Sequence, residues 1–257
     1  MRILSIDSSL GTQLAVVDID EAAEDASTAE TSQTAGRLGA GAPRVLSQAE
    51  QADTRRHAES LGQMLSEALS APDVAERPLD AVVAATGPAP FTGLRAGLVT
   101  ARVVGRTRGI PVHGVSSLDA VARRALDELG AEGEADPVVL VATDARRREV
   151  YAALFRANGP DDVTRLTEID VCPPAQVAGR LDEVGVVDAV AGSGAALYPE
   201  LAELASSREV LAPVSGDALT QVRVALARLG RGEELGTQPL YLRHADVQMP
   251  AARKRVR

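Results

Sequence analysis

The stretch Gly87-Pro88-Ala89-Pro90-Phe91-Thr92-Gly93-Leu94-Arg95-Ala96-Gly97 joins a strand to a helix and decides the fold. The apolar run from Leu79 to Thr86 predicts a buried strand, and the run to Arg108 predicts a helix that Thr92 caps. Small residues recur at every fourth position of that helix and so share one face, namely Gly93, Gly97, Ala101 and Gly105. Such a stripe lets another backbone come close. The segment therefore indicates either a phosphate cradle or a tight helix–helix contact.

Two hairpins, each with an aspartate at its turn, indicate a duplicated architecture. The first lies between Arg2 and Ile19 with Asp7 at its turn, and the second lies between Val138 and Phe155 with Asp144 at its turn. Alternating helices and strands follow each hairpin, which is typical of α/β folds. The other predicted elements are strands at 44–49, 111–115, 163–171 and 186–191 and helices at 55–70, 117–129, 175–183, 198–206 and 217–229.

The pattern divides the chain into two lobes. We expect an N-terminal lobe over residues 1–110 that the helix at 217–229 completes, and a C-terminal lobe over residues 111–216. Residues 230–257 form a C-terminal segment. Within the first lobe, residues 20–43 are rich in Ala, Glu, Gly, Ser and Thr and have no periodicity. This composition predicts a flexible insertion at a hairpin tip.

The composition excludes several classes of protein. Hydrophobic residues make up 45% of the 257, which is enough for a sizeable core, but the net charge of −9 is unfavourable for a stand-alone nucleic-acid binder. The basic run at residues 253–257 is predicted to be a solvated end. Cys172 is the single cysteine, so no intramolecular disulfide is possible. No signal-like segment opens the chain and no apolar run reaches about 18 residues, so we expect a cytoplasmic protein without membrane contact.

The turn residues allow two kinds of chemistry. Asp7 and Ser8 end a strand, where α/β sheets place their ligands, so they indicate either a phosphate-facing hairpin or an aspartate that caps its own turn. The turn at Asp144 lacks the glycine that a backbone phosphate cradle needs. Arg95 is a candidate for contact with phosphate or for an ion pair with a surface acid. The glycine spacing matches neither a Walker A loop nor a dinucleotide fingerprint.

No residue pattern supports metal binding or covalent catalysis. His57, His113 and His244 lie far apart, and none forms the His-x-x-x-His spacing that places two imidazoles on one helix face. No Ser–His–Asp order is recognisable, and no histidine lies near Cys172 in the sequence. We therefore expect no catalytic residue and no metal ligand.

Several sequence blocks together resemble the TsaB (YeaZ) family. They are Arg2 to Ser9, Phe91-Thr92-Gly93-x-Arg95, Gly114 to Leu118, Asp144-Ala145-Arg146-x-x-Glu149-Val150-Tyr151 and, near the end, Pro239-x-Tyr241-Leu242-Arg243. The resemblance implies a two-lobed fold of the actin, Hsp70 and sugar-kinase (ASKHA) type. It also implies a part in making threonylcarbamoyladenosine (t6A) on tRNA, beside the anticodon.

The same resemblance implies a non-catalytic scaffold or activating subunit. Its partner would be TsaD, the metal-bearing transferase paralogue, and a TsaE-like ATPase would complete the assembly. The places of the paralogue's two metal-binding histidines are taken here by Gly114 and Leu118, or by His113 and Ser117. The family resemblance further implies a homodimer when the chain is alone, tRNA contact only through the complex, no cofactor of its own, and ATP or ADP at the complex interface.

The family pairs through its first two helices, which correspond to residues 55–70 and 93–108. We therefore expect a partner interface of small and apolar residues: Leu61, Met64, Leu65, Gly93, Leu94, Gly97, Leu98 and Ala101. On this interpretation, Gly97→Leu should abolish association and leave the fold intact.

Four residues are candidates for a degenerate nucleotide-facing site: Asp7, Ser8, Arg95 and Asp144. The chain has Ala89 and Pro90 where the family often has Gly and Ser, which weakens the phosphate cradle. The alternative function is a nucleotide-dependent phosphotransferase of the same fold, with Asp7 near Mg–ATP.

Overall fold

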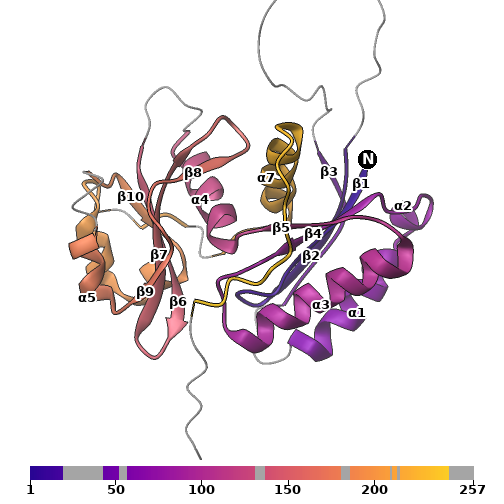
Figure 1. Ribbon diagram of the computed structural model, residues 1–257, viewed down its shortest axis with the longest axis horizontal. Helices are drawn as coiled ribbons and strands as arrows, with labels where there is room; N and C mark the ends of the chain where they lie inside the picture. Colours follow the sequence, from indigo (N-terminus) through magenta and orange to yellow (C-terminus); the bar gives the residue numbers. More distant parts are fainter. Residues whose placement is uncertain are drawn as a thin grey trace, which may run out of the picture.

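Two lobes, each built on a five-stranded sheet, make up the molecule (Figure 1). The computed structural model describes residues 1–19, 43–51, 57–130, 137–180, 186–208, 210–212 and 215–242. The first sheet contains β1 (Arg2–Asp7), β2 (Thr12–Asp18), β3 (Arg44–Gln51), β4 (Ala81–Ala85) and β5 (Val112–Val115). The second contains β6 (Val139–Arg146), β7 (Glu149–Ala157), β8 (Val163–Arg165), β9 (Asp170–Cys172) and β10 (Ala189–Ala191).

Strand β1 lies at the centre of the first sheet, whose order is β3-β2-β1-β4-β5. Its side chains alternate between the two faces of the sheet. Leu4 and Ile6 pack under α1 (His57–Ser70) and α3 (Phe91–Arg108), whereas Ile3 packs under α7 (Ala218–Gly230). Helices therefore cover both faces, and every residue of β1 is buried. The short α2 (Pro72–Ala75) adds Val74 to the core on the α1 side.

The second lobe repeats the opening hairpin of the first. β6 and β7 are antiparallel, as β1 and β2 are, and β10 pairs with β6 in parallel. Helix α4 (Ser117–Glu128) covers one face of this sheet. The other face is covered by α5 (Pro174–Val177), η1 (Ala178–Arg180), α6 (Ser193–Leu197) and η2 (Pro199–Leu204). Cys172 is buried on this second side.

The C-terminal strap, residues 233–242, covers the free edge of β5 without forming a regular strand (Figure 1). The backbone N–H of Gly114 donates to Leu235 O at 3.0 Å, and Leu240 N–H donates to Thr86 O at 2.9 Å. A Cβ on Gly114 would lie 2.2 Å from Gly236 O, so the strap passes too close for any side chain at that position. The strap thereby covers a sheet edge that would otherwise expose unpaired backbone groups.

Several predicted elements differ from those observed. Helix α3 has Pro90 at its N-cap, so Thr92 lies inside the helix and the predicted cap is wrong. The predicted strand at 163–171 is two short strands, β8 and β9, and the predicted helix at 198–206 is the 3-10 helix η2. The predicted helix at 175–183 begins as α5 and η1, and its end lies outside the described residues. Residues 20–42 of the predicted insertion and the basic run at 253–257 also lie outside them.

The stripe of small residues on α3 faces the chain's own sheet, which corrects both interpretations of it. A Cβ on Gly97 would lie 2.3 Å from Ser8 Oγ, at the end of β1. A Cβ on Gly105 would lie 2.2 Å from Val112 Cγ2, on β5. The stripe therefore serves close helix–sheet packing within the first lobe. It is neither a phosphate cradle nor a contact with a second protein.

Candidate functional site

Asp7 caps the turn that follows β1. Its Oδ1 accepts hydrogen bonds from Ser9 N at 2.7 Å and from Ser9 Oγ at 2.5 Å. Its Oδ2 accepts from Gln221 Nε2 of α7 at 3.1 Å. Of the two interpretations of the sequence, the structure supports the aspartate that caps its own turn. The same carboxylate also ties the turn to α7.

Ser8 is buried beneath α3 and connects β1 to that helix. Its Oγ donates to Gly93 O at 2.7 Å and accepts from Gly97 N at 3.0 Å. These are the two backbone groups that an α-helical bond between residues i and i−4 would join. The hydroxyl therefore bridges one turn of α3. It has room to do so because Gly97 has no side chain that would collide with it.

Replacing Ser8 by Ala tests whether this hydroxyl is structural. We expect Ser8→Ala to lower the free energy of unfolding by about 1–3 kcal/mol, because buried backbone groups lose a partner. Urea unfolding followed by far-UV circular dichroism measures this. Ser9→Ala is the control, since Ser9 is more exposed and its own backbone N–H keeps the bond to Asp7. An unchanged unfolding midpoint for Ser8→Ala would contradict the structural role.

Asp144 caps the β6–β7 turn in the same way as Asp7 caps the first. Its Oδ1 accepts from Arg146 N at 2.8 Å, and its Oδ2 pairs with the Arg146 guanidinium at 3.3 Å. The backbone N–H of Asp144 donates to Ser193 Oγ at 3.0 Å. Arg146, Arg147 and Arg148 have φ values of 63°, 56° and 61°, so this turn adopts left-handed backbone without a glycine.

The space beside the two hairpin turns is small. A cavity of about 20 Å³ lies there, lined by residues of both lobes that include Ser9, Pro90, Ser117, Thr143 and Asp144. A separate cavity of about 410 Å³ lies between β2 and β3 of the first lobe and Arg124 of α4. The buried hydroxyls of Ser117 and Thr143 have no hydrogen-bond partner among the described residues. A space of this size holds about one water molecule. A nucleotide does not fit in the cavity beside these turns, so the residues that line this cavity do not match a bound ATP.

The positions of the paralogue's metal pair do not fit a metal either. His113 lies on β5 and is half-buried, and burial lowers its pKa. Ser117 is buried at the start of α4, and Gly114 and Leu118 have no ligating side chain. In the described ranges, no group of three or more His, Cys, Asp or Glu side chains is placed to hold a metal ion. The side chains of His57 and His244 lie outside those ranges.

A groove of about 970 Å³ lies in the second lobe, beside β7 and the segment from Arg165 to Cys172. It contains none of the four candidate nucleotide-facing residues. Cys172 is buried there, and burial raises the pKa of its thiol. A raised pKa disfavours the thiolate, which is the nucleophilic form of cysteine.

Arg95 contacts two aromatic side chains, Phe91 and Tyr241, and among the described residues no acid forms an ion pair with it. Its guanidinium carbon lies 4.0 Å from the centroid of the Phe91 ring, and its Nε donates to the Tyr241 hydroxyl at 3.0 Å. The Phe91 and Tyr241 rings are 5.1 Å apart. Arg95 is therefore held between an aromatic residue of α3 and one of the C-terminal strap. It lies on the outer surface and not among the residues that line the interlobe cavity.

Seven of the eight predicted interface residues lie in the core of the first lobe, which corrects the predicted interface. Leu61, Met64, Leu94, Leu98 and Ala101 are at most 8% exposed. Gly93 and Gly97 are buried as well, and Leu65 is half-buried. The physical reason is that the apolar faces of α1 and α3 already pack on β1, β2 and β4.

The outer side of α3 carries a different set of apolar residues. Phe91, Val99 and Val103 are 53%, 56% and 53% exposed. Arg95 and Arg102 lie on the same side, and Arg102 Nε donates to Thr237 Oγ1 of the strap at 3.1 Å. We call these five α3 residues the α3 face. Tyr241 and Leu242 of the strap are 42% and 38% exposed beside it. An exposed apolar patch with cations among it is typical of a protein-binding surface.

Comparisons with known proteins identify relatives over most of the chain. The model of the family described as "TsaD: tRNA N6-adenosine threonylcarbamoyltransferase" matches residues 44–223. An uncharacterised protein of Mycobacterium tuberculosis is 42% identical over 139 residues, which are 52% of this chain and 61% of that protein. The chain thus spans 61% of the length of that relative. The Escherichia coli tRNA threonylcarbamoyladenosine biosynthesis protein TsaB is 27% identical over 198 residues, 74% of this chain and 82% of that protein.

A solved structure supports the same relationship. YeaZ from Pseudomonas aeruginosa superposes with a TM-score of 0.68 at 25% identity, covering 94% of this chain and 99% of that one. The expected resemblance to TsaB and YeaZ and the two-lobed ASKHA-type fold are confirmed. In the described part of the chain, no helix has the length and apolar character needed to span a membrane.

Proposed function

The chain belongs to the TsaD family of tRNA N6-adenosine threonylcarbamoyltransferases, and we propose that its part in t6A formation is that of a non-catalytic subunit. It pairs with a TsaD-type transferase, which carries the metal and the reaction. A TsaE-like ATPase completes the assembly. The names of the TsaB relatives, which refer to tRNA threonylcarbamoyladenosine biosynthesis, support the process.

The small cavity beside the two hairpin turns is the observation that carries the non-catalytic role. It measures about 20 Å³, and the acids that would face a nucleotide there form hydrogen bonds and ion pairs within the turns. Both carboxylate oxygens of Asp7 accept hydrogen bonds within the chain. One oxygen of Asp144 accepts a hydrogen bond from Arg146 N and the other forms an ion pair with the Arg146 guanidinium. These contacts argue against the alternative, a phosphotransferase with Asp7 beside Mg–ATP. A nucleotide used by the complex would bind at the junction of subunits.

The α3 face supports the pairing. Its apolar side chains are exposed on a rigid helix whose opposite side is anchored in the core. A standard protein interface buries roughly 1,600 Å² in total, and a few apolar or aromatic anchors supply most of its binding energy. Phe91, Val99 and Val103 are the expected anchors. When the transferase is absent, a second copy of the chain takes its place on the same face.

The net charge of −9 supports the proposal that this chain meets tRNA only as part of the complex. An acidic chain gains little from the release of counterions on phosphate binding. The cationic surface that tRNA needs is therefore supplied by the partner.

Reconstitution of tRNA modification tests the proposal. The TsaD-type paralogue, the TsaE-like ATPase and a source of the threonylcarbamoyl adenylate are combined with tRNA, with and without this chain. We expect t6A, measured by mass spectrometry of nucleosides, only when the chain is present. Asp7→Asn keeps the size of the side chain and should leave the t6A yield within about twofold, because no chemical step uses this carboxylate. ATP turnover by the purified chain alone, abolished by Asp7→Asn, would contradict the proposal and favour the phosphotransferase.

A further inference from the structure

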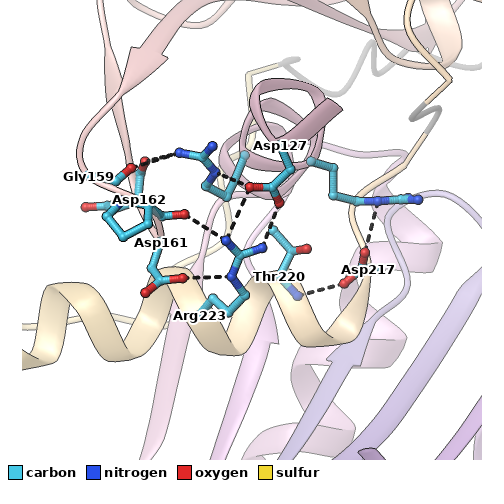
Figure 2. Close-up of polar contacts among 10 residues, drawn as sticks. Asp127, Gly159, Asp161, Asp162, Asp217, Thr220 and Arg223 are labelled. Atoms are coloured by element: carbon cyan, nitrogen blue, oxygen red, sulfur yellow. Dashed lines mark hydrogen bonds and ion pairs between the residues drawn. The ribbon is translucent and has the colours of Figure 1, made fainter. Parts of the chain in front are cut away.

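Helices α4 and α7 face each other between the two lobes (Figure 1). The apolar residues of α7, such as Val222 and Ala225, belong to the core of the first sheet. Those of α4, such as Leu118 and Leu126, belong to the core of the second. Each helix thus belongs to a different lobe. What joins the two helices is a network of arginine and aspartate side chains, shown in part in Figure 2.

The outer half of the network centres on Arg223 of α7. Its guanidinium pairs with Asp127 of α4 at 2.7 Å and with Asp161 of the turn before β8 at 2.8 Å. It also donates to Pro160 O at 2.7 Å. Within the second lobe, Arg123 Nε donates to Asp127 Oδ1 at 3.1 Å and so holds that carboxylate in place (Figure 2).

The inner half is buried. Arg228 of α7 pairs with Asp119 of α4 at 2.8 Å and with Asp162 at 2.9 Å. The side chains of Asp119 and Asp162 are only 3% and 1% exposed. Arg231 also pairs with Asp162, and Arg165 of β8 pairs with Asp119 at 2.8 Å. Burial alone would lower the pKa of Arg228, but the two aspartates outweigh it and raise that pKa.

We propose that this network is a lock that holds the two lobes in one closed orientation and thereby keeps a nucleotide out of the space beside the two hairpin turns. Its members are Asp119, Asp127, Asp161, Asp162, Arg223, Arg228 and Arg231. Removal of one partner from a buried ion pair is strongly destabilising, because it leaves an uncompensated charge in a poorly solvated place. Five ion pairs of the network join residues 223–231 to the second lobe, and movement of the lobes away from each other would separate them. The closed orientation leaves the cavity of about 20 Å³.

Distance measurement between the lobes tests the lock. Spin labels are attached to Ser66→Cys on α1 and Glu200→Cys on η2, both exposed positions, in a Cys172→Ala background. Double electron–electron resonance then gives the distribution of distances between the lobes. Arg223→Met removes two of the ion pairs between the lobes, and Arg223→Met with Arg228→Met removes four. Arg77→Met is the matched control, because Arg77 pairs with Asp18 at 2.8 Å inside the first lobe.

We expect one narrow distribution for the parent and for Arg77→Met. Arg223→Met should broaden it toward longer distances, and the double variant should broaden it further. Amide hydrogen exchange at Gly87, Ala89, Thr143 and Asp144, beside the cavity, should rise in the same order. A double variant that keeps the circular dichroism spectrum and the narrow distribution of the parent would overturn the proposal. If the double variant does not fold, the test rests on Arg223→Met alone. A distance distribution and amide exchange rates equal to those of the parent would then overturn the proposal.

Discussion

Val99→Glu combined with Val103→Glu should abolish binding to the TsaD-type paralogue. The two valines lie one helical turn apart on the α3 face and are each more than half exposed. Two carboxylates there would have to be buried without partners on association, which is costly. Loss of even one central anchor costs about 2 kcal/mol or more, which corresponds to roughly 30-fold in affinity. We therefore expect at least that loss by calorimetric titration or size-exclusion chromatography.

The control for this prediction is Leu197→Glu, at the end of α6 in the second lobe. Leu197 is 58% exposed, so the change has the same kind of effect on surface charge but lies on another face. It should leave the affinity for the partner unchanged. All variants should keep the circular dichroism spectrum of the parent. Normal complex formation by the double valine variant would show that the α3 face is not the docking surface.

The fold could be predicted from the sequence because its signals are local and occur twice. Each hairpin has apolar strands on both sides of an aspartate turn, and the aspartates at positions 7 and 144 do cap those turns. The shorter elements could not be predicted as well. Apolar and polar residues alternate only weakly over residues 163–171, because this segment pairs with β7 as two separate short strands, β8 and β9. Pairing of that kind depends on tertiary contacts that a local pattern does not contain.

The predicted interface residues are buried in the core because periodicity identifies an apolar face of a helix but not the element that packs on it. Leu61, Leu94 and Leu98 follow the helical repeat, and the chain's own sheet occupies that side. The informative signal was on the opposite side of α3, where Val99 and Val103 stand among arginines. Apolar residues on a charged face suggest a binding surface.

The lock left no recognisable trace in the sequence. Arg223 and Arg228 lie on α7 and Arg231 follows it directly, and none of their ion pairs across the lobes joins residues three or four apart in the sequence. Their aspartate partners come from α4 and from the turn before β8, about 60 to 110 residues earlier in the chain. Only the folded chain brings these groups together, so sequence patterns could not reveal the network.

Gly97→Leu should prevent folding, and this replaces the expectation that it would spare the fold and block association. A Cβ at this position would lie 2.3 Å from Ser8 Oγ and 3.2 Å from Ser8 Cβ. Ser8 has no room to yield without losing its bonds to Gly93 and to the helix backbone. Inserting a branched side chain into a packed core typically costs about 1–3 kcal/mol, and the loss of the buried hydrogen bonds adds about 1–3 kcal/mol. The sum is a large part of the roughly 5–15 kcal/mol that stabilises a typical domain.

Gly62→Leu separates this effect from a general intolerance of leucine on helices. Gly62 lies on the exposed side of α1, and a Cβ there would meet nothing within 4 Å. Since leucine favours helix over glycine by up to about 1 kcal/mol, Gly62→Leu should fold with equal or higher stability. Soluble yield, circular dichroism and urea unfolding compare the two variants. A folded Gly97→Leu protein with the stability of the parent would mean that α3 does not rest on Ser8 as described, and that the small-residue stripe is free for another partner.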